Sequence, residues 1–177
     1  MRIIAGDRRG ARIAAPKGTA TRPTGDRVRE AAYNLIGPVD DTAVLDLFAG
    51  SGAMGLEALS RGARRCVFVE SDRAACAVIR DNLEKLRLTD ALVLCKDVFQ
   101  ALREERGAGR TYDLVLLDPP YGTWNELQQH LAEAVPPALA PEGVLVVETS
   151  AKIEPELPLA VVTSRRYGSA RITLFTR

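Results

Sequence analysis

The sequence is poor in cysteine and histidine and has no long apolar run. Its 177 residues include three widely spaced cysteines and one histidine, so neither a disulfide framework nor a zinc site is supported. No apolar run approaches the roughly 20 residues of a membrane helix, and residues 1–12 lack the apolar stretch of a secretory signal. We therefore expect a cytoplasmic monomer with free, mostly buried thiols, no metal and no membrane contact.

The net charge is only +1, but it is unevenly distributed. Residues 1–30 carry eight basic and three acidic side chains (+5), whereas the remainder carries sixteen basic and twenty acidic ones (−4). Because Lys and Arg contacts to phosphate supply much of the sequence-independent affinity for nucleic acids, this basic arm predicts a polyanionic partner. A merely solvated charged tail is the alternative. The candidate RNA-contacting residues are Arg2, Arg8, Arg9, Arg12, Arg22 and Arg27.

Strand-like and helix-like segments alternate along most of the chain. Residues 1–16 predict a β-hairpin around the turn DRRG, and residues 26–36 have helical apolar spacing, with Asp26 or Thr24 placed to cap the helix. Short apolar strands then alternate with helices, which predicts a parallel sheet covered on both faces. The expected strands are 43–48, 65–70, 91–96, 112–118 and 143–148, and the expected helices are 53–61, 73–86, 98–105 and 124–138.

The C-terminal residues 159–177 depart from this alternation. Two strand-like runs surround the turn YGSA with no helix between them, which predicts an antiparallel hairpin at one edge of the sheet. The expected fold is α/β: a doubly wound, mostly parallel seven-stranded sheet with an antiparallel C-terminal strand and a short N-terminal β-hairpin. Residues 1–22 would form the hairpin arm and linker, and residues 23–177 the main domain.

A glycine-rich turn, within VLDLFAGSGAMGLEAL, follows the strand at 43–48 and opens a helix. Gly50, Gly52 and Gly55 have the spacing G-x-G-x-x-G, which allows a tight turn and brings a ligand close to the helix N-terminus. Glu70 lies twenty positions after Gly50 and is placed to bind the two hydroxyls of a ribose. Dinucleotides and S-adenosylmethionine both use such an arrangement.

Two further acids favour S-adenosylmethionine. Asp46, near the end of the first strand, would repel a pyrophosphate but attract the ammonium of a methionine moiety. Asp97, at the end of the third strand, can accept a hydrogen bond from the adenine amine, with Val98 and Phe99 beside the ring. Each acid could instead only cap a strand end. The expected cofactor-binding residues are Thr24, Asp46, Phe48, Ala49, Gly50, Ser51, Gly52, Glu70, Ser71, Asp97, Val98 and Asp118.

The fourth strand ends in LLDPPYGTW. Two prolines in succession make a stiff segment whose carbonyls stay free as acceptors. Asp118 and the Pro119 carbonyl can accept both N–H groups of a nucleobase amine, which favours attack of its nitrogen on a sulfonium methyl. Tyr121 offers a flat face on which an extruded base can stack. We expect a catalytic loop of Asp118, Pro119, Pro120 and Tyr121, although a turn that only ends the strand is the alternative.

These motifs resemble known enzymes. DLFAGSGAMGLEALSRGA and DPPY are similar to motifs of Rossmann-type, S-adenosylmethionine-dependent amino-methyltransferases. RIIAGDRRGARIAAP and RPTGDRVREAAYN further resemble the RsmD family, which methylates the exocyclic N2 amine of a guanine in small-subunit ribosomal RNA. The resemblance covers essentially the full chain. It implies S-adenosylmethionine as cofactor, a target within an assembled or assembling small ribosomal subunit, and closure of Arg22–Glu30 over the methionine end of the cofactor.

Three alternatives remain open. A DNA adenine or cytosine amino-methyltransferase would use the same chemistry, but such enzymes usually carry an added recognition domain. A nicotinamide-dependent oxidoreductase would explain the glycines and Glu70 but leaves Asp46 and DPPY without a task. A catalytically silent RNA-binding protein on this fold would bind RNA without turnover.

Overall fold

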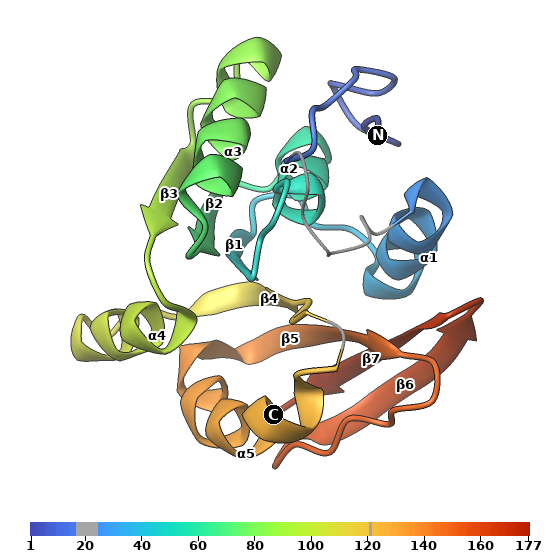
Figure 1. Ribbon diagram of the computed structural model, residues 1–177, viewed down its shortest axis with the longest axis vertical. Helices are drawn as coiled ribbons and strands as arrows, with labels where there is room; N and C mark the ends of the chain where they lie inside the picture. Colours follow the sequence, from blue (N-terminus) through green and yellow to red (C-terminus); the bar gives the residue numbers. More distant parts are fainter. Residues whose placement is uncertain (17–24, 121) are drawn as a thin grey trace.

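A seven-stranded sheet forms the centre of the protein (Figure 1). The structure, a computed structural model, describes residues 1–16, 25–120 and 122–177. The strand order is β3-β2-β1-β4-β5-β7-β6. Strands β1 to β5 run parallel, and β7 is antiparallel to both of its neighbours, β5 and β6. The predicted α/β sheet with an antiparallel C-terminal strand is therefore confirmed.

The elements follow the predicted order. The strands are β1 (Ala43–Leu47), β2 (Arg65–Glu70), β3 (Ala91–Cys95), β4 (Tyr112–Leu117), β5 (Leu139–Ser150), β6 (Ala160–Tyr167) and β7 (Ala170–Thr176). The helices are α1 (Asp26–Ile36), α2 (Ala53–Ser60), α3 (Arg73–Leu86), α4 (Val98–Gly107), α5 (Trp124–Ala134) and the 3-10 turn η1 (Pro136–Ala138). The prediction of one helix over 124–138 is wrong, because the proline pair at 136–137 cannot donate the helical hydrogen bonds.

Helices cover both faces of the sheet. One hydrophobic cluster joins α1, α2 and α3 to one face, and a second joins α4 and α5 to the other. Successive side chains of a strand point to opposite faces, so Leu116 belongs to the first cluster and Leu117 to the second. This double burial explains why the central strands read as unbroken apolar runs.

Helix α1 begins differently from the prediction. Gly25 is its N-cap and makes no side-chain cap hydrogen bond, so the prediction that Asp26 caps the helix is wrong. Asp26 lies instead in the first turn, where a negative charge is favourable beside the helix N-terminus. Thr24, the other candidate cap, lies outside the described residues, as does the predicted domain boundary at 22–23.

The N-terminal segment, residues 1–14, is docked on the body of the protein. In place of the predicted pair of strands it has an isolated antiparallel bridge between Arg2 and Arg12. Ile3 and Ile13 are buried in the hydrophobic cluster that contains α2 and α3. The segment thus contributes to the core and is not a free arm.

The three cysteines are free and mostly buried, as predicted. Cys66 and Cys76 are buried, whereas Cys95 is exposed on β3, an edge strand of the sheet. In the described part of the chain, no group of three or more His, Cys, Asp or Glu side chains is placed to hold a metal ion. None of the described helices is long and apolar enough to cross a membrane.

Candidate functional site at the strand ends

The carboxyl ends of the central parallel strands meet at one edge of the sheet. Leu47, the last residue of β1, pairs with Leu117 of β4 and with Val69 of β2. The residues that come next on these three strands therefore lie at one level: Phe48, Asp118 and Glu70. The chain order reverses between β1 and β4, and open α/β sheets bind ligands at such a switch point. The register thus brings the glycine turn and Asp118, the first residue of the candidate catalytic loop, together, as the sequence predicts.

The turn after β1 has an unusual backbone. Phe48, Gly50 and Gly52 have positive φ angles of 56°, 55° and 75°. This conformation is strained for a phenylalanine, and such strain concentrates at functional sites. A Cβ added to Gly50 would meet only the Phe48 carbonyl oxygen, at 3.9 Å, so the turn is open there. Gly55 has another task, because a Cβ there would lie 2.4 Å from the Phe68 ring and would prevent α2 from packing on β2.

Glu70 holds the glycine turn in place. Its carboxylate oxygens accept hydrogen bonds from the backbone N–H groups of Gly50 and Asp72, both at 2.8 Å. Each carboxylate oxygen can accept more than one hydrogen bond, and the side chain is only half-buried. Glu70 can therefore position the turn and still accept ribose hydroxyls. Ser71, the next candidate residue, is exposed.

Asp46 is buried beneath the glycine turn. It is 3% exposed, and its Oδ2 accepts the backbone N–H of Gly55 at 2.9 Å. Burial raises the pKa of Asp46 to about 7. The hydrogen bond from Gly55 opposes this rise, whereas the negative charge of Glu70 adds to it. The carboxyl therefore ionises near neutral pH, and a cation beside it would lower its pKa again.

Asp97 caps α4. Its Oδ1 accepts hydrogen bonds from the backbone N–H groups of Phe99 at 2.9 Å and Gln100 at 3.0 Å. It is exposed and follows β3 by two residues, so it lies at the same sheet edge as Glu70, the partner of Cys95. Val98, which is also expected to lie beside the adenine ring, is buried, and its side chain packs in the core beneath α4.

The candidate catalytic loop leaves β4 directly at the switch point. Asp118 is half-buried, Pro119 is buried and Pro120 is exposed. The Pro120 carbonyl accepts hydrogen bonds from the backbone N–H of Thr123 at 3.2 Å and from its Oγ1 at 2.7 Å. The prediction that both proline carbonyls stay free is therefore wrong for Pro120, whose bonds tie the loop to the start of α5. Tyr121 lies outside the described residues.

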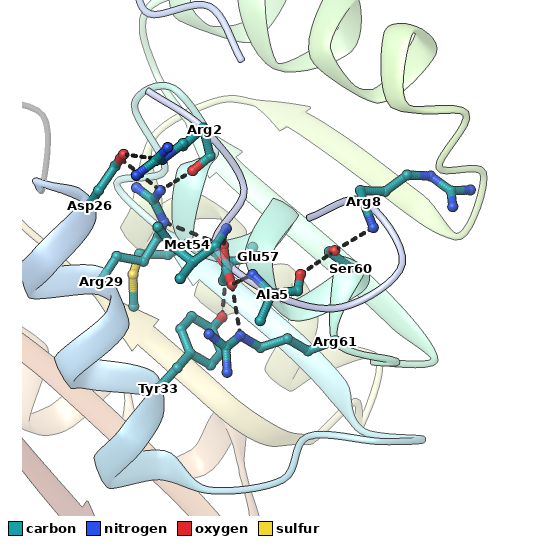
Figure 2. A network of polar contacts seen from close by, with 12 residues as sticks. Arg2, Ala5, Arg8, Asp26, Arg29, Tyr33, Met54, Glu57, Ser60 and Arg61 are labelled. Atoms are coloured by element: carbon teal, nitrogen blue, oxygen red, sulfur yellow. Dashed lines mark hydrogen bonds and ion pairs between the residues drawn. The ribbon is translucent and has the colours of Figure 1, made fainter. Parts of the chain in front are cut away.

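A buried polar network fastens the N-terminal segment to the body (Figure 2). Glu57 of α2 is fully buried, and its carboxylate accepts the backbone N–H groups of Ile4 at 2.8 Å and Ala5 at 2.9 Å. Arg61 donates to the same carboxylate at 2.8 Å, and Arg29 of α1 places its Nε 3.6 Å from it. Sequence reasoning missed Glu57, although an acid within the apolar run of a helix was a signal.

The candidate RNA-contacting arginines have different surroundings. Arg2 forms an ion pair with Asp26 at 3.4 Å, and Arg8 donates through Nε to the Leu86 carbonyl at 2.6 Å. These two side chains therefore also hold the segment in place. Three members of the set are exposed and form no ion pair with any residue that the structure describes: Arg9, Arg12 and Arg27. Arg22 lies outside the described residues.

Asn82 of α3 links the N-terminal segment to the glycine turn. The side chain is buried, and its Oδ1 accepts the backbone N–H of Ala14 at 2.8 Å. Its Nδ2 donates to the carbonyls of Ala14 at 3.1 Å and Ser51 at 3.3 Å. One amide thus joins three elements of the site, and no sequence pattern marked it.

Replacing Glu57 by glutamine is expected to lower the free energy of unfolding by about 3 kcal/mol, because it removes the buried negative charge beside Arg29 and Arg61. The loss is at the lower end of the usual cost because Arg29 keeps its ion pair with Asp26. Urea unfolding measures this. The control is Glu104→Gln, which removes an exposed ion pair to Lys96 (2.7 Å) and should cost less than about 1 kcal/mol. Equal losses in the two variants would show that the Glu57 network does not stabilise the fold.

Two cavities lie away from the strand-end site. One of about 480 Å³ is lined by residues that precede β1 and by Tyr33 and Arg61. The other, of about 260 Å³, lies between α4 and α5 and includes Phe99 and His130. His130 is exposed on α5. Neither cavity is lined by Gly50 or Asp118.

The doubly wound sheet, with a strained glycine turn and an Asp-Pro-Pro loop at its switch point, defines a methyltransferase of the Rossmann type. The chain matches the model of the family described as "Conserved hypothetical protein 95" over residues 1–176, and it belongs to that family. This is the RsmD family that the sequence motifs resemble.

Relatives and solved structures agree with this assignment. The putative rRNA methyltransferase YlbH of Bacillus subtilis (strain 168) is 36% identical and covers all of this chain and 99% of that protein. The ribosomal RNA small subunit methyltransferase D of Escherichia coli (strain K12) is 41% identical over 68% of this chain and 60% of that protein. The structure of the putative methyltransferase yhhF from Escherichia coli superimposes with a TM-score of 0.83 at 33% identity, covering 100% of this chain and 97% of that chain.

Proposed function

We propose that this protein transfers a methyl group from S-adenosylmethionine to the exocyclic N2 amine of a guanine in small-subunit ribosomal RNA, within an assembled or assembling subunit. The observation that carries the proposal is the position of Asp118, which lies level with Phe48 and Glu70 at the switch point of the sheet. The names of the relatives support rRNA as the substrate class. None of the relatives named above is a nicotinamide-dependent oxidoreductase, and that alternative still gives the Asp118 loop no role.

The residues at this edge fit the cofactor. The open space at Gly50 admits a ligand close to the backbone, and the Glu70 carboxylate can accept two ribose hydroxyls. Asp46 supplies a buried negative charge for the methionine ammonium, and the exposed Asp97 can accept from the adenine amine. Bound here, S-adenosylmethionine supplies an electrophilic methyl group on its sulfonium sulfur.

Asp118 and Pro119 activate the nucleophile. The lone pair of a guanine amine is delocalised into the ring, so the nitrogen is a weak nucleophile. Acceptance of its two N–H groups by the Asp118 carboxylate and the Pro119 carbonyl favours a tetrahedral nitrogen with its lone pair directed outward. The carboxylate also stabilises the positive charge that develops on nitrogen. Since the prolines hold these acceptors in place, little reorganisation is required, and stacking of the base on Tyr121 would complete its positioning.

The substrate is recognised mainly as a particle. The methyltransferase fold takes up most of the chain, which leaves the N-terminal segment and its exposed Arg9 and Arg12 to contact RNA beyond the target base. Recognition of a shape is the common mode for structured RNA. Because the substrate is a ribosomal subunit, we place the protein in the cytoplasm, where it acts as a monomer.

Transfer of labelled methyl groups tests the proposal. Small subunits that lack the modification, free small-subunit RNA and duplex DNA are incubated with the protein and S-adenosylmethionine. We expect incorporation into the ribosomal substrates and none into duplex DNA. Incorporation into DNA alone would identify the DNA-modifying alternative. Calorimetry that detects NADH binding but no S-adenosylmethionine binding would refute the proposal altogether.

A further inference from the structure

The C-terminal hairpin reaches beyond the catalytic edge of the sheet. Leu117, the last residue of β4, pairs with Val147 of β5, but β5 continues to Ser150. Strand β7 pairs with β5 along this extension, and residues 168–169 connect β6 to β7 beside Ser150. The hairpin turn therefore lies on the same edge as Asp118 and projects past it. In Figure 1 this turn forms the right-hand tip of the sheet, below α1.

Two arginines flank this tip. Arg165 and Arg166 are exposed near the end of β6, and neither forms an ion pair with any residue that the structure describes. Arg165 pairs with Ile172, whose side chain lies in the cluster under α1, so Arg165 is on the α1 face of the hairpin. Arg166 is on the opposite face, because successive side chains of a strand alternate. The tip therefore carries positive charge on both faces.

The neighbouring Arg171 differs from these two arginines, because it is buried and has intramolecular partners. It is 6% exposed, and its Nη1 donates to Ser164 Oγ at 2.9 Å and lies 3.6 Å from Glu154. Arg165 and Arg166 have no such task. The tip is nevertheless held firmly, since the half-buried Tyr167 packs against the core cluster that contains α1.

Protection of an edge strand does not explain the two arginines. Charged side chains on an edge strand discourage its pairing with another sheet. The apolar part of β6 is at its other end, where Val161 and Val162 are each 59% exposed. Positive charge would be most useful there if it served only to block pairing, yet it is concentrated beside the catalytic edge.

We propose that Arg165 and Arg166 bind phosphates of the RNA strand that flanks the target base. This inference rests on the proposed function and adds a second RNA contact to the one expected from the N-terminal segment. Strand β6 is three strands from β4, about 14 Å at roughly 4.8 Å per strand, so a strand of RNA whose base is at Asp118 passes the hairpin tip. Unpaired guanidinium groups are suited to phosphate oxygens because they can donate two hydrogen bonds at once.

The double variant Arg165→Ala/Arg166→Ala tests the inference on unmodified small subunits. We expect KM to rise about tenfold and kcat to change less than about twofold, because the arginines bind RNA and do not touch the reacting atoms. The slope of log affinity against log salt should decrease by about 1.4, the value for two lost contacts to single-stranded RNA. The conservative variant Arg165→Lys/Arg166→Lys should keep most of the slope.

The matched control is Arg103→Ala/Arg106→Ala, which removes the same charge from exposed positions of α4. A KM and a salt slope equal to those of this control would overturn the inference. It would also be overturned if sedimentation showed a dimer that Arg165→Ala/Arg166→Ala dissociates, since β6 would then bind a second copy of the chain. If the wild-type protein transfers no methyl group to small subunits, the proposed function fails. An active wild type with an unaffected variant refutes only the role of the hairpin.

Discussion

Replacing Asp118 by alanine is expected to lower kcat for methyl transfer by about 10²–10³-fold, the usual cost of losing one preorganised group that stabilises transition-state charge. Asp118 is also among the expected cofactor-binding residues, but affinity for S-adenosylhomocysteine should stay within about twofold, because the ammonium, ribose and adenine are assigned to other residues. Single-turnover kinetics on unmodified small subunits measures the first quantity, and calorimetry measures the second.

A second acid on the same strand is the control for this variant. Asp113 lies at the opposite end of β4, and its Oδ2 accepts the backbone N–H of Ala43 at 2.8 Å. Asp113→Ala removes one hydrogen bond and should reduce stability by about 1 kcal/mol without reducing kcat. Undiminished turnover in Asp118→Ala, or an equal loss in both variants, would contradict the assigned role of Asp118.

Affinity for S-adenosylhomocysteine is expected to rise about tenfold between pH 6 and pH 7.5. The pKa of Asp46 is about 7, so its carboxyl is mostly protonated at pH 6, and only the ionised form attracts the ammonium of the ligand. Calorimetry across this range measures the effect. In Asp46→Asn the affinity should be lower and nearly independent of pH. A pH-independent affinity of the wild-type protein would show that Asp46 does not bind the ammonium.

Ionisation of Asp46 also makes the free energy of unfolding depend on pH. Because burial raises the pKa of Asp46 above its ordinary value of 3.8, the folded state binds this proton more tightly than the unfolded state. Its contribution to the free energy of unfolding is fully present below about pH 4 and is lost as the pH rises to about 7. Asp46→Asn should remove this part of the pH dependence of urea unfolding, and ligand binding should offset it in the wild type.

The parts of the site that lie along single strands could be predicted from the sequence. Unbroken apolar runs identified the central strands, and the residue after each run is by geometry at the carboxyl edge. This is why the sequence places Glu70 and Asp118 at the same edge, and the structure shows them level with each other. The third glycine of the motif, Gly55, serves the packing of α2 on β2, because a Cβ there would lie 2.4 Å from the Phe68 ring.

The residues that join distant segments were not predicted. Glu57 and Asn82 lie in helices, where an acid or an amide is usually a surface residue. Their burial depends on backbone groups of residues 4–14, which are more than 50 positions away in the chain. For the same reason Arg2 and Arg8 appeared to be part of a free basic arm, although the docked segment gives both of them intramolecular partners.

Identification of the methylated atom tests the central claim most directly. Small-subunit RNA from the reaction is digested to nucleosides and analysed by mass spectrometry, with the wild-type protein and Asp118→Ala side by side. If the loop that begins at Asp118 binds an exocyclic amine, the wild-type reaction gives N2-methylguanosine and the variant gives almost none. A methyl group on a ring carbon, a ring nitrogen or a ribose hydroxyl would contradict the account, because none of these positions offers two N–H groups to Asp118 and Pro119.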